Sequence, residues 1–465
     1  MTRLTDRRVL WIALVGALLL AGPGGCVSEH SYVTTTVSFE VTFTAVNGCG
    51  VDGAPACPHS GAPIDFTASV RALDANGNQD TTFSGTVVLS LVPSGLFPEG
   101  SPVLPDGRRV ALITLSGGEA TDVPLQFTRA FGEITLMVED YGYTKAPNVA
   151  DAACYELFPA AGCFAVDDDD PDFGTGAAGV SEVITFDNPR IYDIQYTPPE
   201  LETVGDLGGF PSPLFGFRPT IDAAERPADA TALDDVCDDG QGGRRELVVV
   251  TGLSVDGFYA HDVCNAAGAS FASMYIYNFN TPEDLMVGDC LLELTGTIQE
   301  FQGFTELKNP FWVVDVDDTN PTAPRCADLL PTPVTLDASL LGNDHAMEGF
   351  EAGIVTITDA TLATEFRACD LNGNGALSGS DEWDCSEACG DEIECVVLES
   401  YQTYFQWSVW KDGREVNVVT RGVIDFDPEA NLGLQISRIT GTLRHLDFGR
   451  PAWTIEPRDD DDFVL

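Results

Sequence analysis

The chain has 465 residues, of which 44% are hydrophobic and 9% aromatic, so it can bury a core and is not disordered throughout. That length corresponds to about three domains of about 150 residues each. The formal net charge of −50 disfavours nucleic acid and anionic lipid surfaces as partners. It attracts cations and basic partners, or simply keeps the protein soluble.

Residues 1–25 have the features of an export signal. Three arginines within the first eight residues precede an apolar run at 9–21, which is too short to span a membrane comfortably. Small residues then end in Gly-Gly-Cys at Cys26. This pattern resembles a bacterial lipoprotein signal. The resemblance implies a lipid on Cys26, a tether over residues 26–34, and anchoring to the bacterial envelope at the outer membrane or cell surface. Ordinary cleavage nearby, without a lipid, is the alternative.

Residues 35–145 alternate apolar and polar side chains in short segments separated by turn residues. The alternation predicts strands at 37–44, 65–73, 83–90, 111–115 and 133–139. Such a series predicts a β-sandwich. The passages VRALDANGNQDTTFSGTVVLSL and GEITLMVED resemble bacterial immunoglobulin-like and filamin-like domains, which implies a spacer or adhesive module without catalytic residues. The cluster from Asp74 to Asp80 lacks a glycine at the sixth position of a calcium loop, so it predicts a hairpin turn.

Residues 146–240 hold many glycines and prolines and an acidic run at 167–170. We expect a loop-rich connector stiffened by a disulfide between Cys154 and Cys163, with short strands at 183–186 and 190–195. The acidic run is more typical of a solvated loop than of a cation site.

A second β pattern occupies residues 241–335. It predicts strands at 247–252, 257–262 and 272–277, followed by VGDCLLELTGTIQEFQGFTEL at 287–307. The set resembles the small OB-type β-barrel that accompanies secreted bacterial nucleases. The sequence shows no counterpart of the nuclease domain itself, so the resemblance leaves an accessory or degenerate relative of such a nuclease as an alternative function.

Residues 336–465 repeat this theme. Strands are predicted within 347–364 and at 401–410. The sequence Ile-Thr-Gly-Thr-Leu at 439–443 echoes Leu-Thr-Gly-Thr-Ile at 294–298, which predicts a second OB-like barrel. The fold class expected for the whole chain is therefore all-β: an immunoglobulin-like sandwich followed by two OB-like barrels, rich in disulfides.

The aromatic strand at 401–410 has two interpretations. Tyr401, Trp407 and Trp410 can stack on bases or sugars, as aromatic side chains of OB folds do. They can equally form a buried core face, which is the favoured interpretation. The first interpretation would make the protein a carbohydrate-binding surface protein.

A calcium loop is predicted as an insertion at 369–395 in the second barrel. Its spacing lets one tight loop offer six or more oxygens to Ca²⁺. The loop resembles the EF-hand loop, closest to the dockerin type, and the resemblance implies a structural Ca²⁺ ion. A polar turn without an ion is the alternative. The candidate ligands are Asp370, Asn372, Asn374, Ala376, Ser378, Asp381 and the neighbouring Glu382.

The chain has 13 cysteines, so lipidation of Cys26 would leave an even number for disulfides in an oxidising compartment. Their spacing suggests local pairs, and a cluster surrounds the calcium loop. Zinc is disfavoured because no CxxC motif occurs and the five histidines are scattered. The candidate pairs are Cys49 with Cys57, Cys154 with Cys163, Cys237 with Cys264 and Cys290 with Cys326, and the cluster is Cys369, Cys385, Cys389 and Cys395.

The sequence shows no catalytic constellation: no HExxH, Walker A loop, Rossmann fingerprint or nucleophile elbow is present. We therefore expect a protein that is not an enzyme. The leading hypothesis is a surface lipoprotein that acts as a binding or scaffold module. Its expected contacts are the membrane, through the lipid, and an unidentified protein or glycan, whereas nucleic acid is disfavoured.

Overall fold

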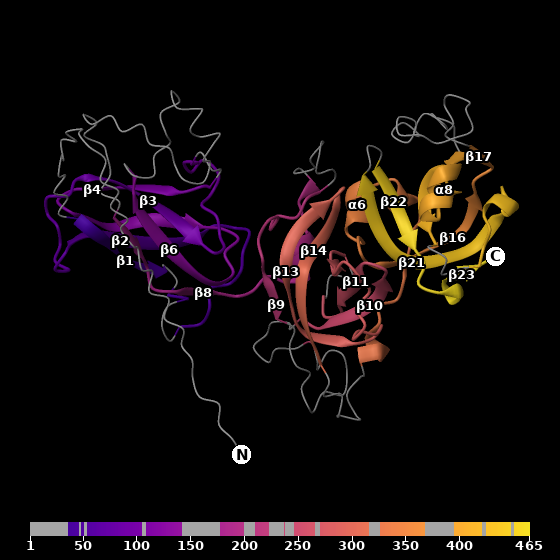
Figure 1. Cartoon of the computed structure of the whole chain (residues 1–465), viewed down its shortest axis with the longest axis horizontal. Coiled ribbons are helices and arrows are strands. Elements are labelled where there is room, and N and C mark those ends of the chain that lie inside the picture. Colours follow the sequence, from indigo (N-terminus) through magenta and orange to yellow (C-terminus); the bar gives the residue numbers. More distant parts are fainter. Residues whose placement is uncertain are drawn as a thin grey trace, which may run out of the picture.

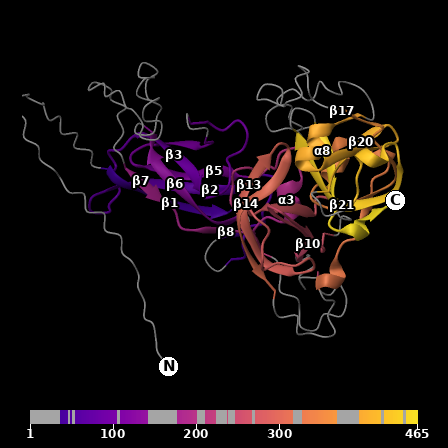
Figure 2. The ribbon, with the colours of Figure 1, turned by 45° about the vertical axis from the view of Figure 1, so that its right-hand side comes forward.

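The computed structural model shows three β units that follow one another along the chain (Figure 1). The second unit lies between the first and the third in both views (Figures 1 and 2). None of the described helices is long and apolar enough to cross a membrane. The described residues are 36–45, 48–50, 54–104, 108–141, 177–199, 210–222, 237, 246–265, 270–315, 326–367, 395–420, 425–447 and 451–465.

The first unit, which we call the N-terminal sheet, is an eight-stranded sheet with the order β4-β3-β6-β7-β1-β2-β5, and β8 pairs with β6. Alternating residues of its strands point into one apolar core that includes Phe66, Phe127 and Leu136. The strands are β1 (Thr36–Ala45), β2 (Ile64–Asp74), β3 (Gly85–Val92), β4 (Ala111–Leu115), β5 (Glu119–Phe127), β6 (Gly132–Asp140), β7 (Ala178–Val180) and β8 (Ile184–Phe186).

The Asp74–Asp80 cluster is a tight turn, because the Asp74 carboxylate accepts hydrogen bonds from the backbone N–H groups of Asn76 and Asn78. The prediction of a turn is confirmed. It closes a short hairpin in which Leu73 and Gln79 pair antiparallel, but β2 and the next strand, β3, are not paired with each other. The chain therefore crosses to another part of the sheet after this turn.

The second unit, barrel A, is a closed ring. The ring runs β10-β11-β12-β14-β13 and returns to β10, with β12 and β14 parallel and β9 added beside β13. Its interior is apolar, with Val248, Met274 and Leu294 fully buried. The elements are β9 (Thr220–Asp222), β10 (Val248–Ser254), β11 (Gly257–Asp262), β12 (Ser273–Tyr277), β13 (Cys290–Phe301), β14 (Phe304–Val314) and the 3₁₀ turn η3 (Cys326–Leu329).

The third unit, barrel B, closes in the same way. Its ring runs β16-β19-β20-β22-β21 and returns to β16, with β20 and β22 parallel. Both rings thus place the fifth strand between the third and the fourth. The elements are β15 (Val334–Thr335), α5 (Ala338–Leu341), α6 (Asp344–Glu348), β16 (Ile354–Leu362), β17 (Glu365–Arg367), β18 (Cys395–Val397), α8 (Leu398–Tyr404), β19 (Gln406–Lys411), β20 (Arg414–Val419), η4 (Glu429–Asn431), β21 (Gln435–Asp447), β22 (Pro451–Glu456), η5 (Asp460–Asp462) and β23 (Phe463–Val464).

Two predicted strands are helical instead. The segment 190–195 forms helix α3 (Ile191–Gln195), in which Ile191, Ile194 and Gln195 are buried at the helical spacing of three and four residues. The Asp193 carboxylate accepts the backbone N–H of Arg190 at the start of this helix. The segment 401–410 is also divided, because α8 continues to Tyr404 and the strand begins only at Gln406.

The described residues of the expected connector at 146–240 belong partly to the N-terminal sheet and partly to barrel A. Strands β7 and β8 complete the N-terminal sheet, whereas α3 and β9 pack on barrel A. Phe131 of the N-terminal sheet contacts Phe217 edge to face, and the Arg129 guanidinium donates to the Pro213 carbonyl at 3.0 Å. The first unit is thus joined to barrel A by packing as well as by the chain.

Three of the expected disulfides are present: Cys49–Cys57, Cys237–Cys264 and Cys290–Cys326. The last two lie in one apolar cluster against Leu247 and Val249 of barrel A. Cys395 is also disulfide-bonded. The other cysteines of the predicted set, Cys154, Cys163, Cys369, Cys385 and Cys389, lie outside the described residues.

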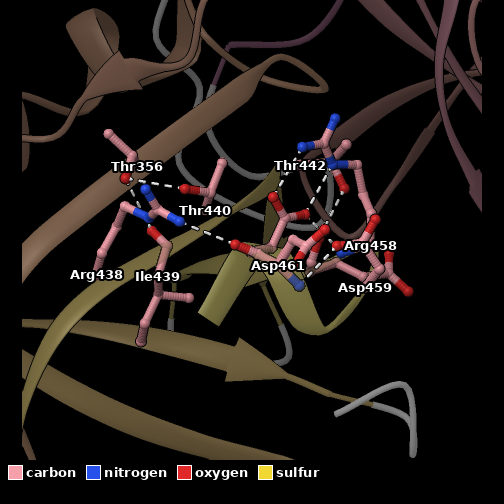
Figure 3. A network of polar contacts seen from close by, with 10 residues as sticks. Thr356, Arg438, Ile439, Thr440, Thr442, Arg458, Asp459 and Asp461 are labelled. Atoms are coloured by element: carbon pink, nitrogen blue, oxygen red, sulfur yellow. Dashed lines mark hydrogen bonds and ion pairs between the residues drawn. The ribbon is translucent and has the colours of Figure 1, made fainter. Parts of the chain in front are cut away.

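The acidic C-terminal run is part of the fold of barrel B (Figure 3). The Arg458 guanidinium donates to both carboxylate oxygens of Asp462 at 2.8 Å. The Asp459 carboxylate accepts the backbone N–H of Asp461, whose carbonyl in turn accepts a hydrogen bond from Arg438 on β21. These contacts hold η5 and β23 against the barrel wall.

Candidate metal centre between the barrels

A buried polar interface, which we call the seam, joins barrel A to barrel B. Charged side chains from both barrels meet there around a small aromatic cluster of Tyr259, Tyr275 and Phe304. Most of these charged residues are less than 10% exposed, and the seam is therefore shielded from water. The charged members are Glu300 and Glu306 from barrel A, and Glu348, Glu351, Arg444, His445 and Glu456 from barrel B.

The segment Glu348–Glu351 is pressed against barrel A. Helix α6 begins with Asn343, whose side chain accepts the backbone N–H of Ala346, and it ends at Glu348. At Gly349 an added Cβ would lie 2.4 Å from the Ser270 hydroxyl of barrel A, so a side chain there would require Ser270 to rotate. Glycine at this position therefore lets the turn approach closely enough to bury both glutamates of the sequence Glu-Gly-Phe-Glu.

Glu348, Glu351 and His445 form the core of the candidate centre. One carboxylate oxygen of each glutamate and one ring nitrogen of His445 all lie within 4.8 Å of one another. The His445 Nδ1 atom is 3.9 Å from the Glu348 Oε2 atom. The three residues are 3%, 2% and 4% exposed, so this group of possible ligand atoms is enclosed by protein.

The hydrogen bonds around the two glutamates are incomplete. The Glu351 Oε2 atom accepts the backbone N–H of Thr305 from barrel A at 3.1 Å. Within the described part of the chain, the Glu351 Oε1 and Glu348 Oε2 atoms are buried without a hydrogen-bond donor. A buried carboxylate oxygen without a donor is costly, so these two atoms lack a partner that the fold would normally supply.

Glu300 adds a third carboxylate to this group. Its Oε1 atom accepts hydrogen bonds from the Ser212 N–H at 2.7 Å and the Thr305 hydroxyl at 2.8 Å. Its Oε2 atom is buried with no donor among the described residues. Burial raises the pKa of Glu300 to about 7, although both hydrogen bonds lower it.

Burial also raises the pKa values of Glu348 and Glu351 well above the ordinary range. The negative charge of Glu300 contributes to the increase for both residues, and the charge of Glu348 adds to it for Glu351. Three acidic groups therefore share one poorly solvated site. Such a site requires either bound protons or a bound cation to balance its charge.

The buried cation nearby, Arg444, lowers the pKa of Glu351 through its charge but forms its ion pair with another carboxylate. Arg444 forms an ion pair with Glu456 at 3.4 Å, and the Tyr259 hydroxyl donates to the same Glu456 carboxylate at 2.6 Å. The Arg444 guanidinium lies 4.9 Å from the Tyr275 ring centre and 5.1 Å from that of Phe304. The two rings contact each other with their centres 5.2 Å apart, so Arg444 of barrel B packs against both rings of barrel A at once.

The ring of His445 is held in place by stacking. It lies parallel to the Trp453 indole, with ring centres 4.4 Å apart and an angle of 16° between the planes. The Trp453 indole N–H in turn donates to Asp344 in α6 at 3.3 Å. The element that carries Glu348 and the strand that carries His445 are thereby fixed relative to each other.

The aromatic residues expected as a stacking platform lie mainly inside the protein. Trp407 is fully buried in the core of barrel B, and Trp410 packs on Ala363 and Val396. Tyr401 is half-buried against the same core. The stacking interpretation is therefore wrong for Trp407, because neither face of its ring is open to a ligand, and the core interpretation applies.

The other predicted sites fall on parts of the chain that the structure leaves undescribed. These are the lipidation site Cys26 and the calcium ligands Asp370, Asn372, Asn374, Ala376, Ser378, Asp381 and Glu382.

Sequence reasoning missed the seam completely. The Glu-x-x-Glu spacing of Glu348 and Glu351 is visible in the sequence, but the chain has 73 acidic residues, so the spacing alone does not stand out. His445 was set aside as one of five scattered histidines. No protein-family model matches the chain, and no curated protein matches it. Function is therefore inferred from the residues and their geometry.

Proposed function

We propose that the protein is a non-catalytic binding or scaffold module of the bacterial envelope. The packing of Arg444 from barrel B against the rings of Tyr275 and Phe304 in barrel A is the observation that carries this proposal. Together with the hydrogen bond from Tyr259 to Glu456, it fixes barrel B to barrel A. Two barrels held in a constant orientation offer a constant surface to a partner, as a scaffold requires.

The partner class follows from strand order and charge. Two closed five-stranded rings with the same connectivity support assignment of both barrels to the OB type, which binds oligonucleotides or oligosaccharides in other proteins. The net charge of −50 opposes an oligonucleotide. A protein or glycan partner therefore fits better. The full proposal includes a lipid on Cys26 and a structural Ca²⁺ ion in the loop Asp370–Asp381.

Membrane fractionation of the full-length chain tests the envelope anchor. We expect the wild type in the membrane fraction with a lipid mass on its N-terminal peptide, and Cys26→Ala in the soluble fraction, because the lipid supplies the only anchor that the proposal contains. Equal membrane retention of both proteins would show that the anchor is assigned wrongly.

The non-catalytic assignment needs a separate assay. The purified protein is incubated with plasmid DNA and with oligosaccharides in the presence of Ca²⁺ or Mg²⁺, and we expect no turnover. Hydrolysis of either substrate by wild-type protein would overturn the scaffold proposal.

A further inference from the structure

We propose that Glu348, Glu351 and His445 bind a divalent transition-metal ion, of which Zn²⁺ is the best representative, inside the seam. This site is distinct from the predicted calcium loop and does not depend on the proposed scaffold function. The ion would link α6 and the turn after it to β21, directly beside the contact between the two barrels.

The spacing of the three ligand atoms suits one ion. A tetrahedral ion with bonds of about 2.1 Å separates its ligand atoms by about 3.4 Å. The His445 Nδ1 and Glu348 Oε2 atoms are 3.9 Å apart, and all three atoms lie within 4.8 Å. These separations exceed the tetrahedral value by at most about 1.4 Å.

The unsatisfied oxygens provide an independent indication of a ligand. Glu348 and Glu351 are almost completely buried, and each has a carboxylate oxygen that meets no donor among the described residues. The other oxygen of Glu351 is already held by the Thr305 N–H, which orients the free one. A cation at the centre of the group would satisfy both oxygens at once.

Charge balance points in the same direction. Glu300 adds its acidic group to the same site, and Arg444, which also lowers the pKa of Glu351, forms its ion pair with Glu456. A divalent cation offsets the repulsion between the carboxylates and the cost of removing them from water. Glu300, which also has an oxygen without a donor, is the candidate for a fourth ligand.

The donor set distinguishes the metal. Ca²⁺ prefers six to eight oxygen ligands, whereas two carboxylates and one imidazole match the ligand types of Zn²⁺ and related ions. The stacking of His445 on Trp453 fixes the imidazole ring, as the surroundings of metal-binding histidines commonly do. Shared protons are the competing way to balance the charge, and they would leave the site without affinity for a metal.

Calorimetric titration with Zn²⁺ decides between these states. We would use residues 27–465, with excess Ca²⁺ present to fill the predicted calcium loop. We expect one saturable site in the wild type and binding weakened by more than about tenfold in Glu351→Gln and in His445→Ala, because each removes one ligand. Glu→Gln preserves the volume of the side chain, so the fold is retained; circular dichroism checks this.

Two matched controls should bind Zn²⁺ as the wild type does. Glu246→Gln makes the same change at another fully buried glutamate, whose carboxylate is satisfied by the Ile191 N–H at 2.8 Å. Asp370→Ala alters the predicted calcium loop alone. Equal Zn²⁺ affinity of Glu351→Gln, His445→Ala and the wild type would overturn the proposal.

A visible absorption spectrum of the wild type with Co²⁺ tests the proposal even if the variants do not fold. One equivalent of Co²⁺ bound to an imidazole and carboxylates gives visible absorption, which Zn²⁺ should abolish by displacement. Absence of this absorption at saturating Co²⁺, together with absence of Zn²⁺ binding, would leave shared protons as the state of the seam and would overturn the proposal.

Discussion

Barrels A and B have the same strand order but are stabilised differently. Barrel A has two disulfides, Cys237–Cys264 and Cys290–Cys326, in one apolar cluster on its wall. The five ring strands of barrel B contain no cysteine. Two of them carry the buried charged residues Arg444, His445 and Glu456 instead. Two disulfides thus reinforce the wall of barrel A, whereas the ring strands of barrel B carry charged residues that barrel A helps to cover.

The shared features of the barrels have a common cause. Gly296 and Gly441, from the two Thr-Gly-Thr sequences, both lie in the fourth strand of their ring. A side chain at Gly296 would collide with Leu307, and one at Gly441 with the Glu456 carbonyl, both in the fifth strand. Glycine allows the fifth strand to approach in each barrel. The glycine that permits ring closure is therefore present in both barrels, whereas the interactions that stabilise the two barrels differ.

The largest effect is expected for Arg444→Met. The substitution leaves Glu456 buried without its ion-pair partner, which costs about 3–5 kcal/mol of the free energy of unfolding. Urea unfolding measures this loss. Arg438→Met is the control, because it lies on the same strand but is exposed, and we expect a loss below about 1 kcal/mol there.

A double variant sharpens this test. Arg444→Met with Glu456→Leu removes both charges, and we expect most of the lost stability to return. If Arg444→Met alone were as stable as the wild type, the seam would not depend on this ion pair, and the contrast between the barrels would fail.

A comparable effect is expected for Cys290→Ser with Cys326→Ser. These cysteines are 36 residues apart, and opening a loop of this size costs about 4 kcal/mol according to the chain-entropy relation. Cys49→Ser with Cys57→Ser opens a separation of only 8 residues and should cost about 2.5 kcal/mol. Urea unfolding of both double variants, monitored with a spectroscopic probe in each unit, compares the two losses of stability. Equal losses would show that loop length does not determine the stabilisation.

The sequence was informative where local pattern determines structure. Local pattern predicted β10, β11 and β12 of barrel A and β16 of barrel B, but it missed β20, and the Thr-Gly-Thr echo predicted that the second barrel repeats the first. Strand β5 was missed, and its alternation is interrupted by Pro124. The structure tolerates this proline because β5 lies at the edge of its sheet. Helix α3 was missed because five residues are too few to show a helical period clearly.

The seam could not be predicted from the sequence for a different reason. Glu351 and His445 are far apart in the chain and meet only because β21 closes the ring against β16. Thr305, which orients Glu351, comes from the other barrel. These acidic residues become a potential ligand group only because barrel A buries them. A local sequence pattern does not indicate this burial.

The last expected effect concerns pH and extends the comparison to a buried histidine in barrel A. His261 is 5% exposed, and burial lowers its pKa from the ordinary 6.5 to about 4. Because the folded-state pKa is the lower one, the neutral ring contributes stability above pH 6.5, and this contribution is lost as pH falls toward 4. The loss reaches about 3 kcal/mol at pH 4.

We would measure the free energy of unfolding of the wild type and His261→Gln from pH 7 to pH 4. Glutamine can still contact the Ser273 hydroxyl, which lies 2.8 Å from the His261 Nδ1 atom, but it does not titrate in this range. We expect the variant to lose less stability on acidification, so the difference between the two proteins should change by up to about 3 kcal/mol. Parallel curves would mean that His261 binds a proton as readily in the folded barrel as in the unfolded chain. Barrel A would then tolerate a buried charge at His261 as well as barrel B tolerates the charges on its wall, and this contrast between the two barrels would no longer hold.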